Sequence, residues 1–488
     1  MNLITRRKFC GGALAALVGG ARGAEGKTEE GLQVLHTTDL HGHVLPTVSY
    51  GGEENVGGFA RCAQQIRNWR AESAESLLID VGDVYQGTLA SWQSRGQLMI
   101  DLFNKVGYDG WVLGNHEFDW GPEVVEEALK RSEMPALAAN LRLDGKMVGA
   151  ERTEGLFQKL RPWMLKEVGG EKVAVIGLIT PGLPYWLRQE LLGPIEVVDP
   201  EPVLKRCVKE VRAEGATKVV VAGHMGWRER GDDYASPVEE TLAGSGVDLY
   251  LGGHTHRRKE MWDSRGIPCA QAAYHGLSCG RVKIGGGTLV SELAEMDASV
   301  DFDPLVMEVA GQRLEEAKVE SERVVGLIPE IVAGQAQVRD FLCEAFLAAA
   351  EKAGMKVDAV FHGTFGTEAI EKGEFRVEDA WKVIPYENQM VVAELTLAEM
   401  SAIVREGGGA RGSDRALFGD LEEHAQAVRP KKGVGEKERY RVLFNSYDAQ
   451  SGGRRMPVLR EILGLESSRS RLLALETREA LIDYVASL

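Results

Sequence analysis

Cysteine is scarce in this chain, and the paired arrangement C-x-x-C does not occur. The 488 residues include six cysteines: Cys10, Cys62, Cys207, Cys269, Cys279 and Cys343. Without a C-x-x-C pair, a thiolate zinc knot is not expected. Cys269 and Cys279 are close enough in sequence for a local disulfide. The alternative is that these thiols are buried and pack as small apolar side chains.

Positive charge is also in short supply. Lys and Arg number 57 against 73 Asp and Glu, which gives a net charge of −16. A chain this acidic is a poor candidate for binding a nucleic acid polymer or an anionic membrane surface. An anionic substrate would need locally concentrated positive charge, and bound metal ions could supply it.

No stable membrane anchor is expected at the N-terminus. The apolar run at residues 11–20 is about half of the roughly 20 residues that span a bilayer. It follows Arg6-Arg7-Lys8 and precedes small residues up to Ala24, which is typical of a signal peptide. The paired arginines resemble a twin-arginine signal. We therefore expect residues 1–24 to engage the twin-arginine export machinery, and the mature protein to be periplasmic or extracellular.

The length predicts two domains, because one hydrophobic core rarely organises so many residues. In the first domain, expected at 32–300, short apolar strands alternate with amphipathic helices, which indicates an α/β fold with helices covering the sheets. Strands are predicted at 33–38, 76–80, 110–113, 172–176, 218–221 and 247–251, and helices at 58–70, 91–106, 122–130 and 202–214.

Residues 301–328 are charged and are expected to form a connecting helix to a second domain at 329–488. That domain is predicted to contain a helix through 348–350, strands at 357–361 and 391–395, a glycine-rich loop at 405–414 and a closing helix at 472–484.

Polar side chains gather where five of the predicted strands of the first domain end. Ligands bind at the carboxyl ends of strands in open α/β sheets, so these side chains are expected to share one site. They are Asp39, His41, Asp83, Asn115, His224, His254 and His256.

This donor set suits zinc, manganese or iron. Seven ligands exceed what one ion needs but suit two ions that share a carboxylate. Asp39 and His41 are predicted to alternate in a strand and so to leave it on the same face, as are His254 and His256. One buried histidine is more often a hydrogen-bonded core residue than a ligand, but five strand ends meeting the same requirement by chance is improbable.

Together these motifs resemble the signature of the calcineurin-like metallophosphoesterases. The resemblance rests on Asp39-x-His41, Gly82-Asp83, Gly114-Asn115-His116-Glu117, Gly223-His224 and Gly252-Gly253-His254-x-His256. Asp119, the chain length and the second domain narrow it to the 5′-nucleotidase family. The resemblance implies a layered α/β/β/α domain followed by a smaller α+β substrate-binding domain.

The resemblance also implies roles for individual residues. One metal ion would be held by Asp39, His41, Asp83 and His256, and a second by Asp83, Asn115, His224 and His254, with Asp83 bridging the two. His116 belongs to neither set and would stabilise the transition state or act as a general acid. Asp119 would orient its imidazole and favour its protonated form.

The second domain departs from the family pattern. Where the family usually carries an arginine that contacts phosphate, this chain has Thr367. Arg415, Arg454 and Arg455 are alternative sources of that charge. The segment around Tyr447 resembles the one in which a tyrosine of related cyclic-nucleotide phosphodiesterases stacks on a nucleobase, and Phe418 is a candidate for the opposite side of such a sandwich.

These observations predict an exported dinuclear-metal phosphohydrolase that acts on nucleotides, in the manner of a 5′-nucleotidase. Within the enzyme class the alternatives are a nucleoside 2′,3′-cyclic phosphodiesterase, a UDP-sugar hydrolase and a thiosulfohydrolase-like enzyme. The alternative outside that class is a pseudoenzyme that binds a ligand without converting it.

Overall fold

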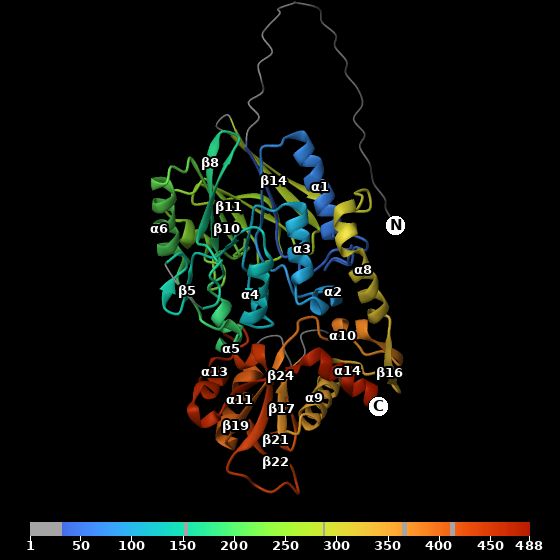
Figure 1. Ribbon diagram of the computed structural model, residues 1–488. Helices are drawn as coiled ribbons and strands as arrows, with labels where there is room; N and C mark the ends of the chain where they lie inside the picture. Colours follow the sequence, from blue (N-terminus) through green and yellow to red (C-terminus); the bar gives the residue numbers. More distant parts are fainter. Residues whose placement is uncertain (1–31, 151–154, 286–287, 364–367, 410–414) are drawn as a thin grey trace, which may run out of the picture.

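Two six-stranded sheets form the centre of the N-terminal domain. In the computed structural model, which describes residues 32–150, 155–285, 288–363, 368–409 and 415–488, these sheets face each other (Figure 1). The first has the order β15-β14-β1-β2-β3-β4, and the second has the order β12-β13-β11-β10-β8-β7.

The strand bounds follow sheet by sheet. The first sheet contains β15 (Thr288–Glu295), β14 (Ser278–Gly285), β1 (Leu32–Thr37), β2 (Ser76–Asp80), β3 (Gly110–Val112) and β4 (Ala136–Leu137). The second contains β12 (Arg258–Ser264), β13 (Ile267–Ala272), β11 (Leu249–Gly252), β10 (Lys218–Gly223), β8 (Glu171–Leu178) and β7 (Trp163–Val168). A small sheet of β5 (Leu141–Leu143), β6 (Lys146–Met147) and β9 (Ile195–Val197) lies beside them.

Alternation along the strands divides the apolar side chains between the two faces of each sheet. In β1, Val34 packs between the sheets against β10 residues such as Val220, whereas Leu35 packs outward against Phe59 of α1. Both faces are therefore apolar, as expected for mostly parallel sheets covered on each side. Helices cover the outer faces and complete the expected α/β/β/α arrangement.

The helices of this domain fall into two layers. Those packed on the first sheet are α1 (Phe59–Glu72), α3 (Gln97–Val106), α4 (Pro122–Arg131) and α8 (Pro304–Ser321), and those packed on the second are α6 (Pro200–Ala213) and α7 (Val238–Leu242). Shorter helices are α2 (Leu89–Gln93), α5 (Gln189–Leu192) and the 3-10 turns at His116–Phe118 and Leu183–Tyr185.

The C-terminal domain has one central sheet of order β20-β17-β23-β19-β24. Helices α9, α10 and α14 cover one face, and α11 and α13 cover the other. The bounds are β17 (Ala359–His362), β19 (Gln389–Leu395), β20 (Ala416–Gly419), β23 (Tyr440–Asn445), β24 (Arg471–Glu476), α9 (Gln335–Lys352), α10 (Val377–Val383), α11 (Leu397–Gly409), α12 (Ser446–Ala449), α13 (Pro457–Gly464) and α14 (Thr477–Ser487). The pairs β16 (Val324–Ile328) with β18 (Gly373–Arg376) and β21 (Leu421–His424) with β22 (Ala427–Pro430) complete it, with a 3-10 turn at Glu466–Ser468.

Several predicted elements differ from the structure. The helix predicted at 91–106 is two helices, because Gly96 has a left-handed backbone (φ 76°) between them. The connecting helix ends at Ser321, and β16 follows because it pairs with β18. The closing helix begins only at Thr477, because the preceding residues pair with β19 as β24. The expected loop at 405–414 is helical as far as Gly409, and 410–414 lie outside the described residues.

The local disulfide between Cys269 and Cys279, one of the two possibilities that the sequence left open, is not formed. Cys269 lies in β13 and faces α6 and α7, whereas Cys279 lies in β14 and faces α1. All five described cysteines are buried free thiols, which agrees with the alternative interpretation. Within the described part of the chain, no helix combines the length and apolarity needed to cross a bilayer.

Candidate active site

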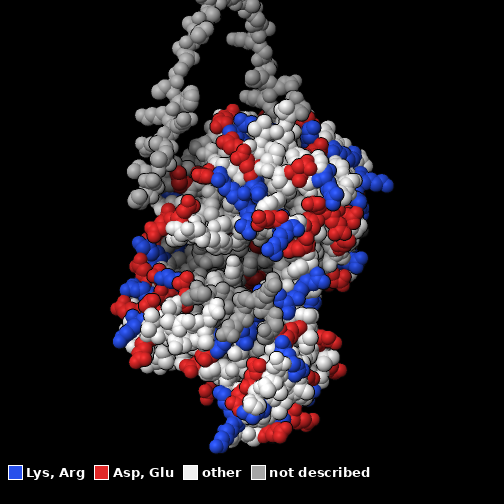
Figure 2. All heavy atoms as spheres, turned by 180° about the vertical axis from the view of Figure 1, so that it is seen from behind, with Lys and Arg blue, Asp and Glu red and all other residues white. Residues whose placement is uncertain are grey.

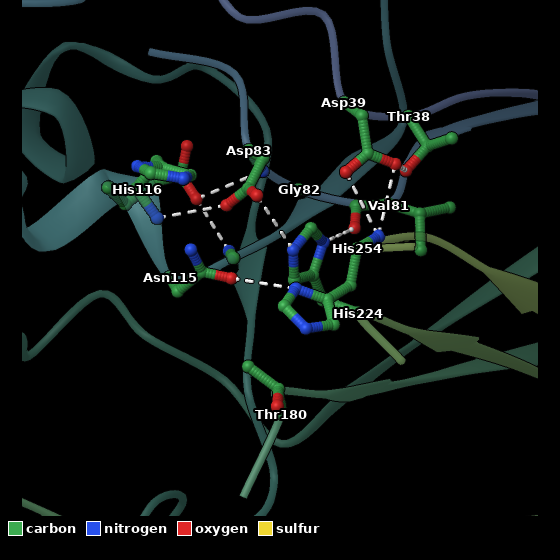
Figure 3. A network of polar contacts seen from close by, with 12 residues as sticks. Thr38, Asp39, Val81, Gly82, Asp83, Asn115, His116, Thr180, His224 and His254 are labelled. Carbon is green, nitrogen blue, oxygen red and sulfur yellow. Dashed lines mark hydrogen bonds and ion pairs between the residues drawn. The ribbon is translucent and has the colours of Figure 1, made fainter. Parts of the chain in front are cut away.

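The predicted site residues of the N-terminal domain come together at the carboxyl ends of the strands. Figure 3 shows five of the seven predicted donors: Asp39, Asp83, Asn115, His224 and His254. The loops that follow β1 and β2 stay hydrogen-bonded to each other beyond the strands. The amide of Asp39 donates to the carbonyl of Gly82 (2.9 Å), and the amide of His41 donates to the carbonyl of Asp83 (2.9 Å). The parallel pairing of the two strands therefore continues into the loops and sets three donor side chains side by side.

The prediction that Asp39 and His41 alternate within a strand is wrong. Strand β1 ends at Thr37, and both residues lie in the loop with positive φ angles of 51° and 48°. The same prediction for His254 and His256 is also wrong, because β11 ends at Gly252 and both residues lie in the loop after it. They and Asp83 have the same left-handed backbone, with φ of 71°, 53° and 56°. Such angles are uncommon outside glycine and concentrate at functional sites, where the surrounding structure holds the strain.

Crowding at the strand ends explains why glycines precede the donors. A Cβ atom on Gly114 would lie 2.2 Å from the carboxylate of Asp83, and one on Gly253 would lie 2.4 Å from the hydroxyl of Thr38. The strand ends approach so closely that only glycine fits at these two positions.

Four side chains form the first donor cluster: Asp39, His41, Asp83 and His256. The Nε2 atom of His256 lies 3.0 Å from Nε2 of His41 and 3.4 Å from the carboxylate of Asp39. The His41 ring lies 3.9 Å from the carboxylate of Asp83. Asp39 and Asp83 are fully or almost fully buried, so two carboxylates face two imidazoles out of contact with water.

The second cluster contains Asp83, His224 and His254 and is joined by Asn115. The Nε2 atom of His224 lies 3.0 Å from the carboxylate of Asp83, and Nδ1 of His254 lies 3.0 Å from the side-chain oxygen of Asn115. Asp83 belongs to both clusters. Figure 3 shows Asp83, Asn115, His224 and His254 directed toward one another.

Backbone carbonyls orient two of the imidazoles. Nδ1 of His41 donates to the carbonyl of Gln86 and Nδ1 of His224 donates to that of Val81, both over 2.7 Å, which leaves each Nε2 directed at the carboxylates. Burial lowers the pKa of His41 and of His254 well below the usual value, so both rings are neutral and able to act as ligands.

The charge balance of the site favours a cation. Burial alone would lower the pKa of His224, but the charge of Asp83 outweighs it and raises that pKa to about 9. Nε2 of His224 is buried and faces the carboxylate of Asp83 at 3.0 Å. The raised pKa shows that Asp83 attracts positive charge at this point, and the donor set fits divalent metal ions.

His116 lies beside the clusters but belongs to neither of them. Its Nδ1 is 2.6 Å from the carboxylate of Asp119, and its backbone amide donates to Asp83 over 2.9 Å. Burial lowers the pKa of His116, but the charges of Asp119 and Asp83 outweigh this and raise it to about 10. Bound cations would oppose that rise by repelling the added proton.

Glu117 is a site residue that our sequence reasoning used only as part of a motif. Its buried carboxylate accepts hydrogen bonds from the amides of Asp83 (3.1 Å), Val84 (2.7 Å) and Gly114. It thus ties the loop after β2 to the loop after β3. The sequence feature that could have revealed this role is the position of Glu117 directly after His116 in the Asn-His-Glu block.

A cavity of about 970 Å³ opens over the two donor clusters and lies between the two domains. Its N-terminal wall includes Asn115, His116 and Trp186, and its C-terminal wall includes Tyr386 and Tyr447. This volume is at the upper end of the range of about 300–1,000 Å³ for small-molecule sites.

On the face shown in Figure 2, acidic and basic side chains are interspersed, without a broad field of one sign.

The substrate residues predicted in the C-terminal domain have different positions. Tyr447 lines the cavity, and its hydroxyl accepts a hydrogen bond from Arg455 over 2.9 Å. Phe418 does not line it. Phe418 lies in β20 and packs against the core of that domain, which excludes the predicted sandwich with Tyr447 in this structure.

Of the three arginines considered as substitutes, only Arg455 lines the cavity. Arg415 is buried and forms a two-pronged ion pair with Asp448. Arg454 stacks over the rings of Tyr185 and Tyr234. Thr367 lies outside the described residues.

Most of the aromatic residues that line the cavity were not predicted from the sequence, and two of them stack on histidines of the site. The ring of Trp186 stacks on His254 with centroids 5.0 Å apart, and the ring of Tyr386 stacks on His116 at 5.9 Å. Neither belongs to a motif, and each is far in sequence from the histidine that it covers, so no local pattern revealed them.

Comparisons with known proteins agree with this architecture. The calcineurin-like phosphoesterase family matches residues 32–258. The snake venom 5′-nucleotidase of Gloydius brevicauda is 35% identical over 233 residues, which cover 46% of this chain and only 37% of that protein. A probable 5′-nucleotidase of Treponema pallidum is 26% identical over 525 residues and 86% of each chain.

Among solved structures, the 5′-nucleotidase precursor from Thermus thermophilus has a TM-score of 0.67 at 23% identity, with 93% of this chain and 96% of that chain covered. That likeness spans both domains and establishes the shared fold. The N-terminal match identifies residues 32–258 as a calcineurin-like phosphoesterase domain, and the two-domain likeness shows that the chain has the fold of the solved 5′-nucleotidase.

Proposed function

We propose that this protein is an exported, dinuclear-metal phosphohydrolase that acts on nucleotides. The observation that carries the proposal is the pair of donor clusters that share Asp83, placed beside the His116–Asp119 pair at the floor of the cavity. The 5′-nucleotidase relatives support nucleotides as the substrate class.

Asp39, His41, Asp83 and His256 would hold one divalent ion, and Asp83, Asn115, His224 and His254 the other. Such ions supply charge neutralisation for phosphate oxygens and lower the pKa of water. The residues contribute fixed geometry, because their rings and carboxylates are buried and hydrogen-bonded to backbone groups.

His116 would provide the proton for the leaving group or stabilise charge that develops on the phosphoryl oxygens. Its Nδ1–H is engaged by Asp119, so Nε2 is the atom that can carry a transferable proton. The carboxylate of Asp119 orients the ring and favours its protonated form.

The leaving group would occupy the space between the domains. Tyr447 offers an aromatic face to a nucleobase, and Arg455 offers a cation from the same wall. The lack of an arginine at Thr367 leaves the hydrolysis of 2′,3′-cyclic nucleotides as a competing specificity.

The central experiment measures bound metal and the hydrolysis products of each substrate together on the mature chain. After treatment with a chelator, the protein is reloaded with manganese or zinc and assayed with AMP, 2′,3′-cyclic AMP, UDP-glucose, thiosulfate-bearing peptide and p-nitrophenyl phosphate. We expect two ions per chain and fastest turnover of AMP. Two bound ions without turnover of any substrate would instead identify a pseudoenzyme, and preference for another substrate would correct the specificity.

Export through the twin-arginine machinery is part of the proposal and has its own test. Replacing Arg6 and Arg7 by Lys keeps the charge but removes the paired guanidinium groups that distinguish this signal. The precursor of that variant should remain in the cytoplasm. Undiminished periplasmic protein would contradict the twin-arginine assignment.

A further inference from the structure

Gln86 lies where the metal site, the His116–Asp119 pair and the C-terminal domain meet. Only 2% of the residue is exposed. Its backbone carbonyl accepts the Nδ1–H of His41 over 2.7 Å. Its side-chain nitrogen donates to the same carboxylate oxygen of Asp119 that pairs with His116.

The side-chain oxygen of Gln86 reaches across to the C-terminal domain. It accepts a hydrogen bond from the backbone amide of Glu387 over 3.2 Å. One amide orientation therefore satisfies both contacts, because the nitrogen faces a carboxylate and the oxygen faces an N–H group. A primary amide suits this position, since it offers a donor and an acceptor without charge.

The C-terminal partner segment is firmly attached to its own domain. The buried carboxylate of Glu387 accepts hydrogen bonds from the hydroxyl of Thr477 (2.7 Å) and the amide of Arg478 (3.2 Å) at the start of α14. The residue before it, Tyr386, stacks on His116. The segment thus touches the His116–Asp119 pair in two ways, directly through Tyr386 and indirectly through Gln86.

We propose that Gln86 is a positioning residue that couples docking of the C-terminal domain to the His116–Asp119 pair. When the amide of Glu387 occupies the oxygen of Gln86, the side-chain nitrogen is held against Asp119, and Asp119 in turn fixes the imidazole. The proposal rests on the catalytic role proposed for His116. It adds that this role depends on a contact between the domains.

The test compares Gln86→Met with a matched control. Methionine has a similar length but forms neither hydrogen bond. Gln97→Met is the control, because Gln97 is also buried in the N-terminal domain but donates to the carbonyls of Arg95 and Val124, away from the cavity. For AMP, Gln86→Met should lower kcat by about tenfold to a hundredfold through misplacement of the acid, with KM and metal content nearly unchanged.

The double variant with Asp119→Asn should lose little more activity than Asp119→Asn alone, because both changes act through one imidazole. The proposal would be overturned if Gln86→Met had wild-type kcat or lost its metal ions. An equal loss of kcat in Gln97→Met would also overturn it. Hydrolysis by the wild-type chain tests the proposed function separately.

A spectroscopic readout decides the coupling even if the wild-type chain hydrolyses no phosphate ester. In zinc-loaded protein with ¹⁵N-labelled histidine, the Nδ1–H resonance of His116 is identified by its loss in His116→Ala. We expect this resonance to move or broaden in Gln86→Met and, to a smaller extent, in Thr477→Val, which loosens the Glu387 segment from the C-terminal side. An unchanged resonance in either variant would overturn the coupling.

Discussion

The N-terminal wall of the cavity and its C-terminal wall differ in how their side chains are held. On the N-terminal side, Asp39, Asp83 and His224 are almost fully buried and anchored to backbone groups. On the C-terminal side, Tyr386 is 43% exposed and Arg455 is also exposed. We expect the buried side chains of the N-terminal wall to keep a fixed geometry for the reaction and the exposed side chains of the C-terminal wall to contact the substrate.

This comparison predicts that substitutions on the two walls affect different kinetic quantities. The largest effect is expected at Asp83, the side chain shared by both donor clusters. Asp83→Asn keeps the shape but removes the negative charge that a bridged pair of cations requires. Metal content after dialysis should fall toward zero, and activity should fall by about 10⁴-fold or more. Two retained ions per chain would show that Asp83 does not bridge them.

The next effect concerns the acid rather than the ions. His116→Ala should leave the metal content nearly unchanged and lower kcat by about 10²–10⁴-fold, the usual contribution of a positioned acid–base group. KM should change little, because only interactions specific to the transition state raise the rate. Asp119→Asn should cause a smaller loss. If His116→Ala loses its metal ions, His116 is itself a ligand, and assigning the ligand role to Asn115 but not to His116 is wrong.

A smaller effect, on the other wall, is expected from Tyr447→Ala. Loss of an aromatic face for the base should raise KM for AMP by about tenfold, since base–aromatic stacking is worth about 1–3 kcal/mol. The hydrolysis of p-nitrophenyl phosphate should change much less, because its ring needs no nucleobase site. Tyr447→Phe serves as the control, since it keeps the ring and loses only the hydroxyl that meets Arg455. Equal losses for both substrates would place Tyr447 in the reaction rather than in recognition.

The last effect is expected in stability rather than activity and concerns a histidine below the N-terminal wall. His36 is completely buried, and neither ring nitrogen has a hydrogen-bond partner among the described residues. Burial lowers the pKa of His36 from 6.5 to about 4. Below about pH 6.5 the unfolded chain takes up a proton that the folded chain excludes, so stability is fully present above that pH and falls as the pH approaches 4.

Between pH 7 and pH 5, His36 should therefore cost about 2 kcal/mol of unfolding free energy. Denaturant unfolding of the wild type and of His36→Leu at both pH values measures this contribution as the difference between the two pH dependences. His424→Leu, at an exposed histidine, is the control. Equal pH dependence in the wild type and His36→Leu would show that the buried ring accepts its proton without penalty.

The N-terminal site could be anticipated from sequence because its signals are local. Each donor follows a buried strand and most follow a glycine, and parallel strands carry their ends to one edge. The same reasoning gave the wrong backbone for Asp39 and His41, because apolar periodicity does not report where a strand ends and a strained loop begins.

The C-terminal wall could not be anticipated in the same way. Gln86 and Glu387 are 301 residues apart in sequence, and the stacking of Tyr386 on His116 depends on how the domains dock. Phe418 shows the opposite error, since this aromatic residue of a polar segment is half-buried against the core once β20 pairs with β17. Contacts that depend on tertiary packing produce no periodic pattern of apolar and polar residues in the sequence.

The left-handed backbone at Asp39, His41, Asp83, His254 and His256 restricts which mutations this site can tolerate. Aspartate, asparagine and histidine adopt that conformation more readily than other residues with a side chain, and they are also good metal donors. A glutamate at position 83 would keep a carboxylate but would strain the backbone and carry its oxygens one carbon farther out. Two requirements, donor chemistry and a left-handed backbone, thus limit which residues these positions accept. Substitutions that look chemically conservative are therefore expected to disrupt the site.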